Sequence, residues 1–193
     1  YEDQRKIVWD QVTRDLTAQG ILTAFGDPHP EVAAMVDTLS RPDRLLDCRW
    51  WRRDVGGKMV RFVVCRKGDR HVVAARDEDM LVLQRVAPQV GLSAMVNVVI
   101  GDAAPADVEP LTGIAAKLAE VRTAEQLAGY GMPPSSARIY AEATGNPDSW
   151  VEITASERHP GGTFSGAGVG AGVLDSPHGR IVSIPRRVSG DLY

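Results

Sequence analysis

Two kinds of hydrophobic pattern follow one another along the chain. In residues 3–19 the apolar side chains recur three or four positions apart, which predicts an amphipathic helix, and Gly20 suits its C-terminal cap. The same helical spacing predicts further helices at 30–39, 114–121, 124–130 and 135–143. Prolines mark the ends of two of them, since Ser40-Arg41-Pro42 and Gly145-Asn146-Pro147 both stop a helix.

After each helical segment the apolar period changes to two. Leu46, Cys48 and Trp50 would point to one side of a strand, and the intervening polar side chains to the other. Strands of antiparallel meanders are predicted by this spacing at 46–53, 60–64, 71–76, 80–86, 150–157, 164–174 and 181–186. The order, helices and then strands, occurs twice.

An internal repeat supports two related halves. The segment Leu22-x-x-Phe25-Gly26-x-Pro28 matches Leu127-x-x-Tyr130-Gly131-x-Pro133 at a shift of 105 positions (22 + 105 = 127). The shift persists without a gap to Gly56-Gly57 and Gly161-Gly162. Glycine and proline fix turns and element ends, so their repetition implies repeated structure. We therefore expect a single domain whose halves, 1–104 and 105–193, are related by a pseudo-twofold axis.

Composition narrows the function classes. The 193 residues carry 22 Lys+Arg and 25 Asp+Glu, a net charge of −3 with the signs interspersed, so nucleic acid is not an expected partner. No apolar run is long enough to span a membrane. Two cysteines and four histidines without ligand spacing predict no metal and no cofactor, and a reducing cytoplasm is the default location. The first and last residues suggest an internal piece of a longer protein.

A glycine-rich segment offers the only enzyme-like motif. Gly166-Ala167-Gly168-Val169-Gly170-Ala171 fits a dinucleotide fingerprint, which requires a strand followed by a helix. Pro177 leaves no room for that helix, so a nucleotide-binding enzyme using 161–172 is the weaker alternative. On a strand, the alternate glycines at 166, 168, 170 and 172 would instead expose bare backbone to a helix of this chain or of a partner. We expect no catalytic residues.

The polar face of the first predicted hairpin has the composition of an interface. It carries Asp47, Arg49, Trp51, Arg53, Met59 and Arg61. Aromatic residues, Met and Arg are the types that interfaces favour over ordinary surface. The alternative is an arginine that stacks on Trp51 merely to cover it. Cys48 and Cys65, on paired strands, are expected to be buried thiols near one another.

Two segments resemble a known family. Pro147-Asp148-Ser149-Trp150-Val151-Glu152-Ile153 and Asp175-Ser176-Pro177-His178-Gly179-Arg180-Ile181, with the twice-repeated order of helices and meander, resemble the EspG proteins of mycobacterial type VII (ESX) secretion systems. The resemblance implies a cytosolic, non-enzymatic chaperone of α+β fold, with a central antiparallel β-sheet flanked by helical bundles. Its partner would be the PPE subunit of a PE–PPE heterodimer, which it would keep soluble and direct for export. Self-association into a weak homodimer is left open.

The resemblance also implies where the partner binds. The family's interface involves the sheet, the loop between the first two meander strands and the C-terminal helical bundle. Together with the hairpin face, this makes the expected partner-binding residues Arg49, Trp51, Arg53, Asp54, Val55, Gly56, Gly57, Lys58, Met59, Arg61, Leu127, Met132, Ile139, Gly166, Gly168 and Gly170. The loop 54–58 is short and does not assign the particular ESX system.

Overall fold

The computed structural model describes residues 2–185, 187–188 and 191–192. Its helices are α1 (Glu2–Ala18), α2 (Pro30–Ser40), α3 (Leu92–Ile100), α4 (Ala115–Leu118), α5 (Ala124–Gly129) and α6 (Pro134–Gly145). Its strands are β1 (Arg44–Arg52), β2 (Lys58–Lys67), β3 (Arg70–Asp77), β4 (Met80–Val86), β5 (Ser149–Arg158), β6 (Phe164–Ser176), β7 (Gly179–Ser183), β8 (Arg187–Val188) and β9 (Asp191–Leu192). The described helices include none that is long and apolar enough to cross a membrane.

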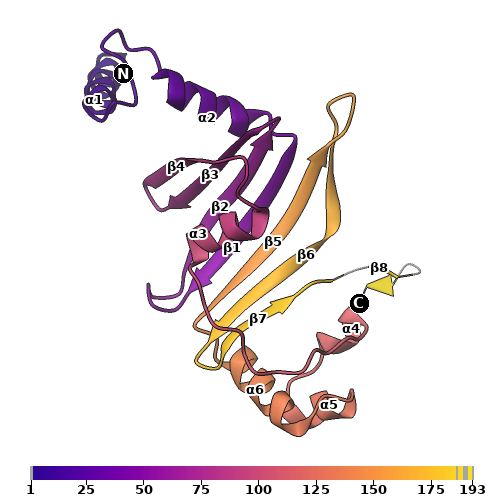
Figure 1. Ribbon diagram of the computed structural model, residues 1–193. Helices are drawn as coiled ribbons and strands as arrows, with labels where there is room; N and C mark the ends of the chain where they lie inside the picture. The colour runs from indigo at the N-terminus through magenta and orange to yellow at the C-terminus, as the bar shows by residue number, and fades with distance from the viewer. Residues whose placement is uncertain (1, 186, 189–190, 193) are drawn as a thin grey trace.

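A seven-stranded antiparallel sheet forms the centre of the molecule, in the order β4-β3-β2-β1-β5-β6-β7 (Figure 1). Strands β8 and β9 pair separately. The predicted α+β class with a central antiparallel sheet is therefore confirmed. The two meanders join through β1 and β5, which are far apart in the chain and pair along their whole length.

Helix α3 covers one face of the sheet. Its Met95, Val96 and Ile100 are buried in a core cluster with side chains of β1, β2, β3, β5 and β6. Phe62 and Cys48 are the most enclosed of these, at 1% and 0% exposed. The period of two that predicted β1 holds, because Cys48 and Trp50 are buried on this face and Asp47 and Arg49 are exposed on the other.

Helix α2 packs on the opposite face, at one corner. It contacts β2, β3 and β4, and Cys65 and Val72 are 1% exposed on that side of the sheet. The expectation that Cys48 and Cys65 lie near one another is wrong, because the alternation of side chains sends them to opposite faces. Both are free thiols, and burial raises the pKa of Cys48 to about 12 and that of Cys65 to about 11.

Sequence analysis did not predict α3. Its segment, Leu92–Ile100, is rich in β-branched residues and nearly lacks polar positions, so its periodicity does not distinguish a buried helix from a strand. The helix ends at Gly101, whose φ of 79° and N–H bond to the Asn97 carbonyl (2.8 Å) close the last turn. Helix α4 and strand β7 are shorter than the predicted 114–121 and 181–186.

Backbone hydrogen bonds repeat at the shift of 105. The Arg53 N–H donates to the Asp148 carbonyl (2.9 Å), and the Arg158 N–H donates to the Asp43 carbonyl (2.8 Å). Each group of one bond lies 105 positions from its counterpart in the other, since 43 + 105 = 148 and 53 + 105 = 158. The same relation joins Cys48 to its cross-strand partner Ile153. An approximate twofold axis therefore passes between β1 and β5 at this pair.

The helices follow the same axis. Helices α2 and α6 lie at opposite ends of the sheet (Figure 1). Their C-cap residues, Arg41 and Asn146, share nearly the same backbone conformation, with φ/ψ of −142°/58° and −144°/62°. We interpret 1–104 and 105–193 as the two related units of a single domain.

An acidic side chain fastens each of these helices to a hairpin. Asp37 of α2 accepts hydrogen bonds from Lys67 (2.8 Å) and Arg70 (2.8 Å) at the β2–β3 turn. These donors, Lys67 first, hold the pKa of Asp37 well below its usual range. The equivalent residue of α6 is Glu142 (37 + 105 = 142), which lies 2.9 Å from His178 Nε2 at the β6–β7 turn.

Candidate partner-binding face

The face of the sheet opposite α3 is only partly covered, and we call its central part the open face. It consists of alternate side chains of β1, β2, β3, β5, β6 and β7. Strand β1 contributes Asp47, Arg49 and Trp51, because its other side chains enter the core beneath α3. Strand β2 contributes Met59 and Arg61 by the same alternation. The structure thus brings the hairpin residues expected from sequence onto one surface.

An apolar row crosses five strands of the open face. The pairing register places the following side chains next to one another from β2 to β7: Met59, Trp51, Trp150, Leu174 and Ile181. Trp51 and Trp150 are half-buried and pair directly across β1 and β5, while Met59 is 40% exposed. Neighbouring side chains on one face of a sheet lie within contact distance, so the row forms a continuous apolar strip.

A charged row runs beside the apolar row. In register across β3, β2, β1 and β5 lie Arg76, Arg61, Arg49 and Glu152, all exposed. Neither Arg49 nor Arg61 forms an ion pair with another described residue. Like charges directly opposite one another on neighbouring strands are unfavourable. This row, which we call the arginine row, carries three positive charges against the one negative charge of Glu152, an excess that an acidic partner surface would match.

The loop from Arg53 to Lys58 borders the apolar row. Gly57, with φ of 76°, packs so closely on Trp51 that a Cβ there would lie 3.3 Å from the indole Nε1. Lys58 donates to Glu78 (2.6 Å) in the β3–β4 turn, which raises the pKa of Lys58 and lowers that of Glu78. Asp54 accepts from Arg52, which lowers the pKa of the Asp54 carboxyl. These contacts fasten the loop, and Val55 stays exposed at its tip.

Trp51 is not covered by a stacked arginine in the way that the alternative supposed. The arginine stack of this hairpin joins Arg52 to Trp50, with the guanidinium carbon 4.5 Å from the ring centroid. Both residues point to the α3 side of β1, because the alternation separates them from Trp51. The indole of Trp51 therefore lies against Gly57 of the loop and next to Trp150 of the apolar row.

The glycines of β6 differ from expectation. Gly170 and Gly172 face the open side, as predicted for a strand, but their nearest neighbours belong to strands. A Cβ on Gly170 would lie 3.0 Å from the Ile153 carbonyl oxygen, and one on Gly172 would lie 2.6 Å from Ser183 Oγ. The expectation of an internal helix on these two glycines is thus wrong.

The course of β6 also bears on Gly166, on Gly168 and on the dinucleotide fingerprint. Gly166 is paired with Ser156 and also lines a cavity near α3, and the surroundings of Gly168 lie outside what the structure describes. The segment Phe164–Ser176 is one strand within the sheet and turns directly into β7. The dinucleotide fingerprint at 166–171 is therefore wrong, because it requires a helix after the strand, and the nucleotide-binding alternative loses the motif on which it rested.

The C-terminal helices do not present the residues that were expected to contact a partner. Leu127 and Met132 are 3% and 4% exposed and form a second core cluster with Ala137. Ile139 is half-buried. Leu127 and Met132 thus hold α5 and α6 together, and a direct contact between them and a partner is contradicted by their burial. The capping box of Thr123 and Gln126 begins α5 and fixes its direction.

Sequence reasoning missed half of the open face. Trp150, Glu152 and Leu174 were placed on strands but not on a surface with Trp51. The alternation of side chains along each strand was visible in the sequence. The direct pairing of β1 with β5 was not, because it joins segments about a hundred residues apart. The described residues contain no group of three or more His, Cys, Asp or Glu side chains that could hold a metal ion.

Comparison with known proteins adds a family to this geometry. The family model described as "EspG family" matches residues 1–192. The chain is 70% identical over 191 residues to the ESX-1 secretion-associated protein EspG1 of Mycolicibacterium smegmatis, covering 99% of this chain and 68% of that protein. It is 68% identical over 192 residues to EspG1 of Mycobacterium tuberculosis, covering 100% and 68%.

A solved structure has the same fold. It is the Mycobacterium tuberculosis type VII secretion system chaperone EspG5 in complex with a PE25–PPE41 dimer. The likeness has a TM-score of 0.73 at 18% identity and covers 93% of this chain and 76% of EspG5.

Proposed function

Because this chain belongs to the EspG family, we propose that it is a chaperone of a type VII secretion system. It binds the PPE subunit of a PE–PPE heterodimer, keeps the pair soluble and directs it for export. The names of its relatives favour the ESX-1 system. The complex of EspG5 with PE25–PPE41 supports a partner of this kind, since the two chains share a fold.

The observation that carries the proposal is the pair of rows on the open face. The apolar row of Met59, Trp51, Trp150, Leu174 and Ile181 provides a surface for the apolar tip of a helical hairpin. The arginine row beside it provides charge that orients a partner carrying acidic residues. A rigid aromatic centre with a charged rim is the arrangement in which a few residues contribute most of the binding energy.

The C-terminal helices take a supporting role in this proposal. Leu127 and Met132 set the position of α6, which lies at one end of the sheet (Figure 1). Contacts with the partner at that end come from exposed positions of these helices, while Ile139 is available only in part. The loop 54–58 contributes at the edge of the apolar row.

The proposed chaperone acts in the cytoplasm, where a PE–PPE pair is found before export, and it is not an enzyme. The proposed role is to cover a surface of the partner, and this role requires neither catalytic residues nor a cofactor. The buried thiols Cys48 and Cys65, whose pKa values are raised, fit a structural role and not a nucleophilic one.

Co-expression with PE–PPE pairs tests the proposal. We expect an ESX-1 PE–PPE pair to co-elute with the chain in size-exclusion chromatography and to stay soluble at concentrations at which the pair alone aggregates. The PE25–PPE41 dimer, which EspG5 binds, serves as the control pair from another system. Separate elution of every ESX-1 pair, with a folded chain, would contradict the proposed function.

A further inference from the structure

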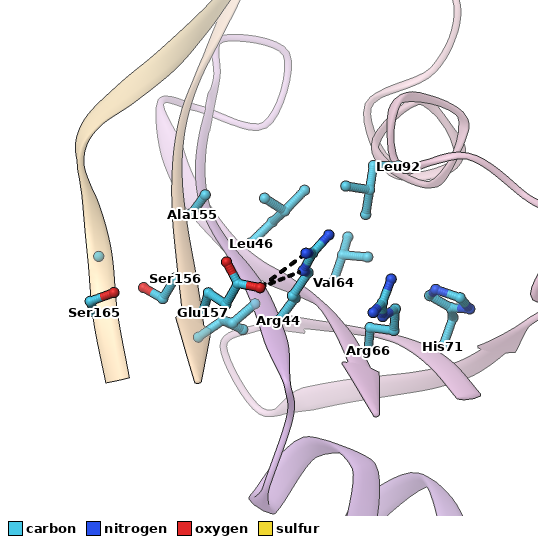
Figure 2. Close-up of a pocket in the computed structure, with 12 residues that line it drawn as sticks. Arg44, Leu46, Val64, Arg66, His71, Leu92, Ala155, Ser156, Glu157 and Ser165 are labelled. Carbon is cyan, nitrogen blue, oxygen red and sulfur yellow. Dashed lines mark hydrogen bonds and ion pairs between the residues drawn. The ribbon is translucent and has the colours of Figure 1, made fainter. Parts of the chain in front are cut away.

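A cavity of about 430 Å³ lies on the α3 side of the sheet, away from the open face (Figure 2). It is formed where β1, β2, β3, β5 and β6 pass beneath the start of α3. Its apolar wall consists of Leu46, Val64, Leu92 and Ala155. This volume falls within the range of sites that enclose small molecules.

Two buried nitrogen atoms belong to side chains that line this cavity and have no hydrogen-bond partner among the described residues. His71 is 8% exposed, and its Nδ1 is buried without a hydrogen bond among the described residues. The Nε of Arg66 is also buried without a hydrogen bond among the described residues. Arg66 and His71 are direct neighbours, because they pair across β2 and β3. Buried polar atoms are nearly always hydrogen-bonded in folded proteins, so two orphans on adjacent residues indicate that a ligand completes the site.

The charges of the cavity select the sign of that ligand. Arg44 and Arg66 contribute two positive charges, and Glu157 contributes one negative charge that Arg44 already binds at 3.0 Å. Figure 2 shows this ion pair beside Arg66, which forms no ion pair with a described residue. Leu92 is the first residue of α3, and the N-cap residue of this helix makes no side-chain hydrogen bond. The positive end of the helix dipole therefore adds to the positive charge of the cavity.

We propose that this cavity binds a small organic carboxylate with a short apolar chain. The side chains of Arg66 and His71 turn their buried nitrogens toward the carboxylate and donate hydrogen bonds to it, and the apolar chain packs on Leu46, Val64 and Leu92. A planar guanidinium matches a carboxylate in geometry as well as in charge. The site is independent of the proposed chaperone function, because it lies on the opposite side of the sheet from the apolar row.

Titration with octanoate tests this site, followed by calorimetry and by amide chemical shifts. We expect saturable binding with shifts at Val64, His71 and Leu92, and much weaker binding of octan-1-ol, which lacks the charge. Arg66→Met should weaken octanoate binding about tenfold or more, because a charge-assisted hydrogen bond is lost. It should also remove the preference for octanoate over octan-1-ol, which a merely structural role of Arg66 would leave unchanged.

Arg85→Met is the matched control, since it removes an exposed arginine of β4 from the other face of the same sheet, outside both rows of the open face. It should bind octanoate as the unchanged chain does, and both variants should keep their melting temperatures within a few degrees. Failure of octanoate to saturate the unchanged chain would overturn the proposal. Equal affinity in Arg66→Met and Arg85→Met, or equal binding of octan-1-ol and octanoate, would overturn it as well. None of these outcomes bears on PE–PPE binding, which the proposed function places on the other face of the sheet.

Discussion

Gly179→Ala should destabilise the chain strongly, because this residue lies where the segment leading into the second half crosses the sheet. The Arg180 N–H donates to the Ala104 carbonyl (2.7 Å), and the Ala106 N–H donates to the Arg180 carbonyl (3.0 Å). A Cβ on Gly179 would lie 2.7 Å from the Ala104 oxygen and 2.8 Å from the Ala106 nitrogen. Backbone atoms cannot yield cheaply at such distances, so the crossing segment would have to move.

The expected loss has two sources. Gly179 has a φ of 109°, which an alanine adopts only at a cost of about 1–3 kcal/mol. Overpacking against the backbone of 104–106 adds about 1–3 kcal/mol. A loss near 3 kcal/mol lowers the melting temperature of a chain of this length by about 6–12 °C.

Gly131→Ala separates the two sources. Gly131 also has a positive φ, 92°, but nothing lies within 4 Å of a Cβ built there. This control should lower the free energy of unfolding only by the cost of the positive φ, about 1–2 kcal/mol. Thermal and urea unfolding, followed by circular dichroism, measure both variants. If Gly179→Ala is no more destabilising than Gly131→Ala, the packing of the crossing segment against β7 is not as described.

Three further results are expected. Phe62→Ala should cost about 3–5 kcal/mol in urea unfolding, since its ring is 1% exposed beneath α3; a cost below 1 kcal/mol would contradict that core. The thiols of Cys48 and Cys65 ionise more readily when unfolded, so the free energy of unfolding should fall as the pH rises above about 9; a constant value from pH 8 to 11 would refute their burial. Arg61→Glu should raise stability by about 0.2–1 kcal/mol by relieving its repulsion with Arg49. The same variant should lower affinity for the PE–PPE pair, and a gain in affinity would argue against the arginine row.

Local patterns predicted the elements of this fold well. The alternation through Cys48 and Trp50 identified the buried face of β1, and the repeated prolines and glycines located α2 and α6. These features depend on nearest neighbours in the chain, which the sequence displays directly. The repeat also anticipated the central axis, because a shift that preserves turns preserves the strands between them.

Features that depend on contacts between distant segments were missed. Helix α3 has a sequence that suits a strand, and only its packing against the sheet decides between the two. Leu127 and Met132 carry no local mark that separates a core side chain from an interface side chain. The cavity at Arg66 and His71 requires the ends of five strands to meet, and nothing in the spacing of its residues reveals it.

The most direct test of the central claim is the affinity of Trp51→Ala for an ESX-1 PE–PPE pair, measured beside Trp9→Ala. Trp9 is 67% exposed on α1, far from the open face, and provides the same chemical change outside the proposed interface. Loss of a central aromatic anchor costs about 2 kcal/mol or more, so Trp51→Ala should bind about thirtyfold more weakly. Trp9→Ala should bind as the unchanged chain does. If both variants fold and bind the pair equally well, the open face is not where the partner binds.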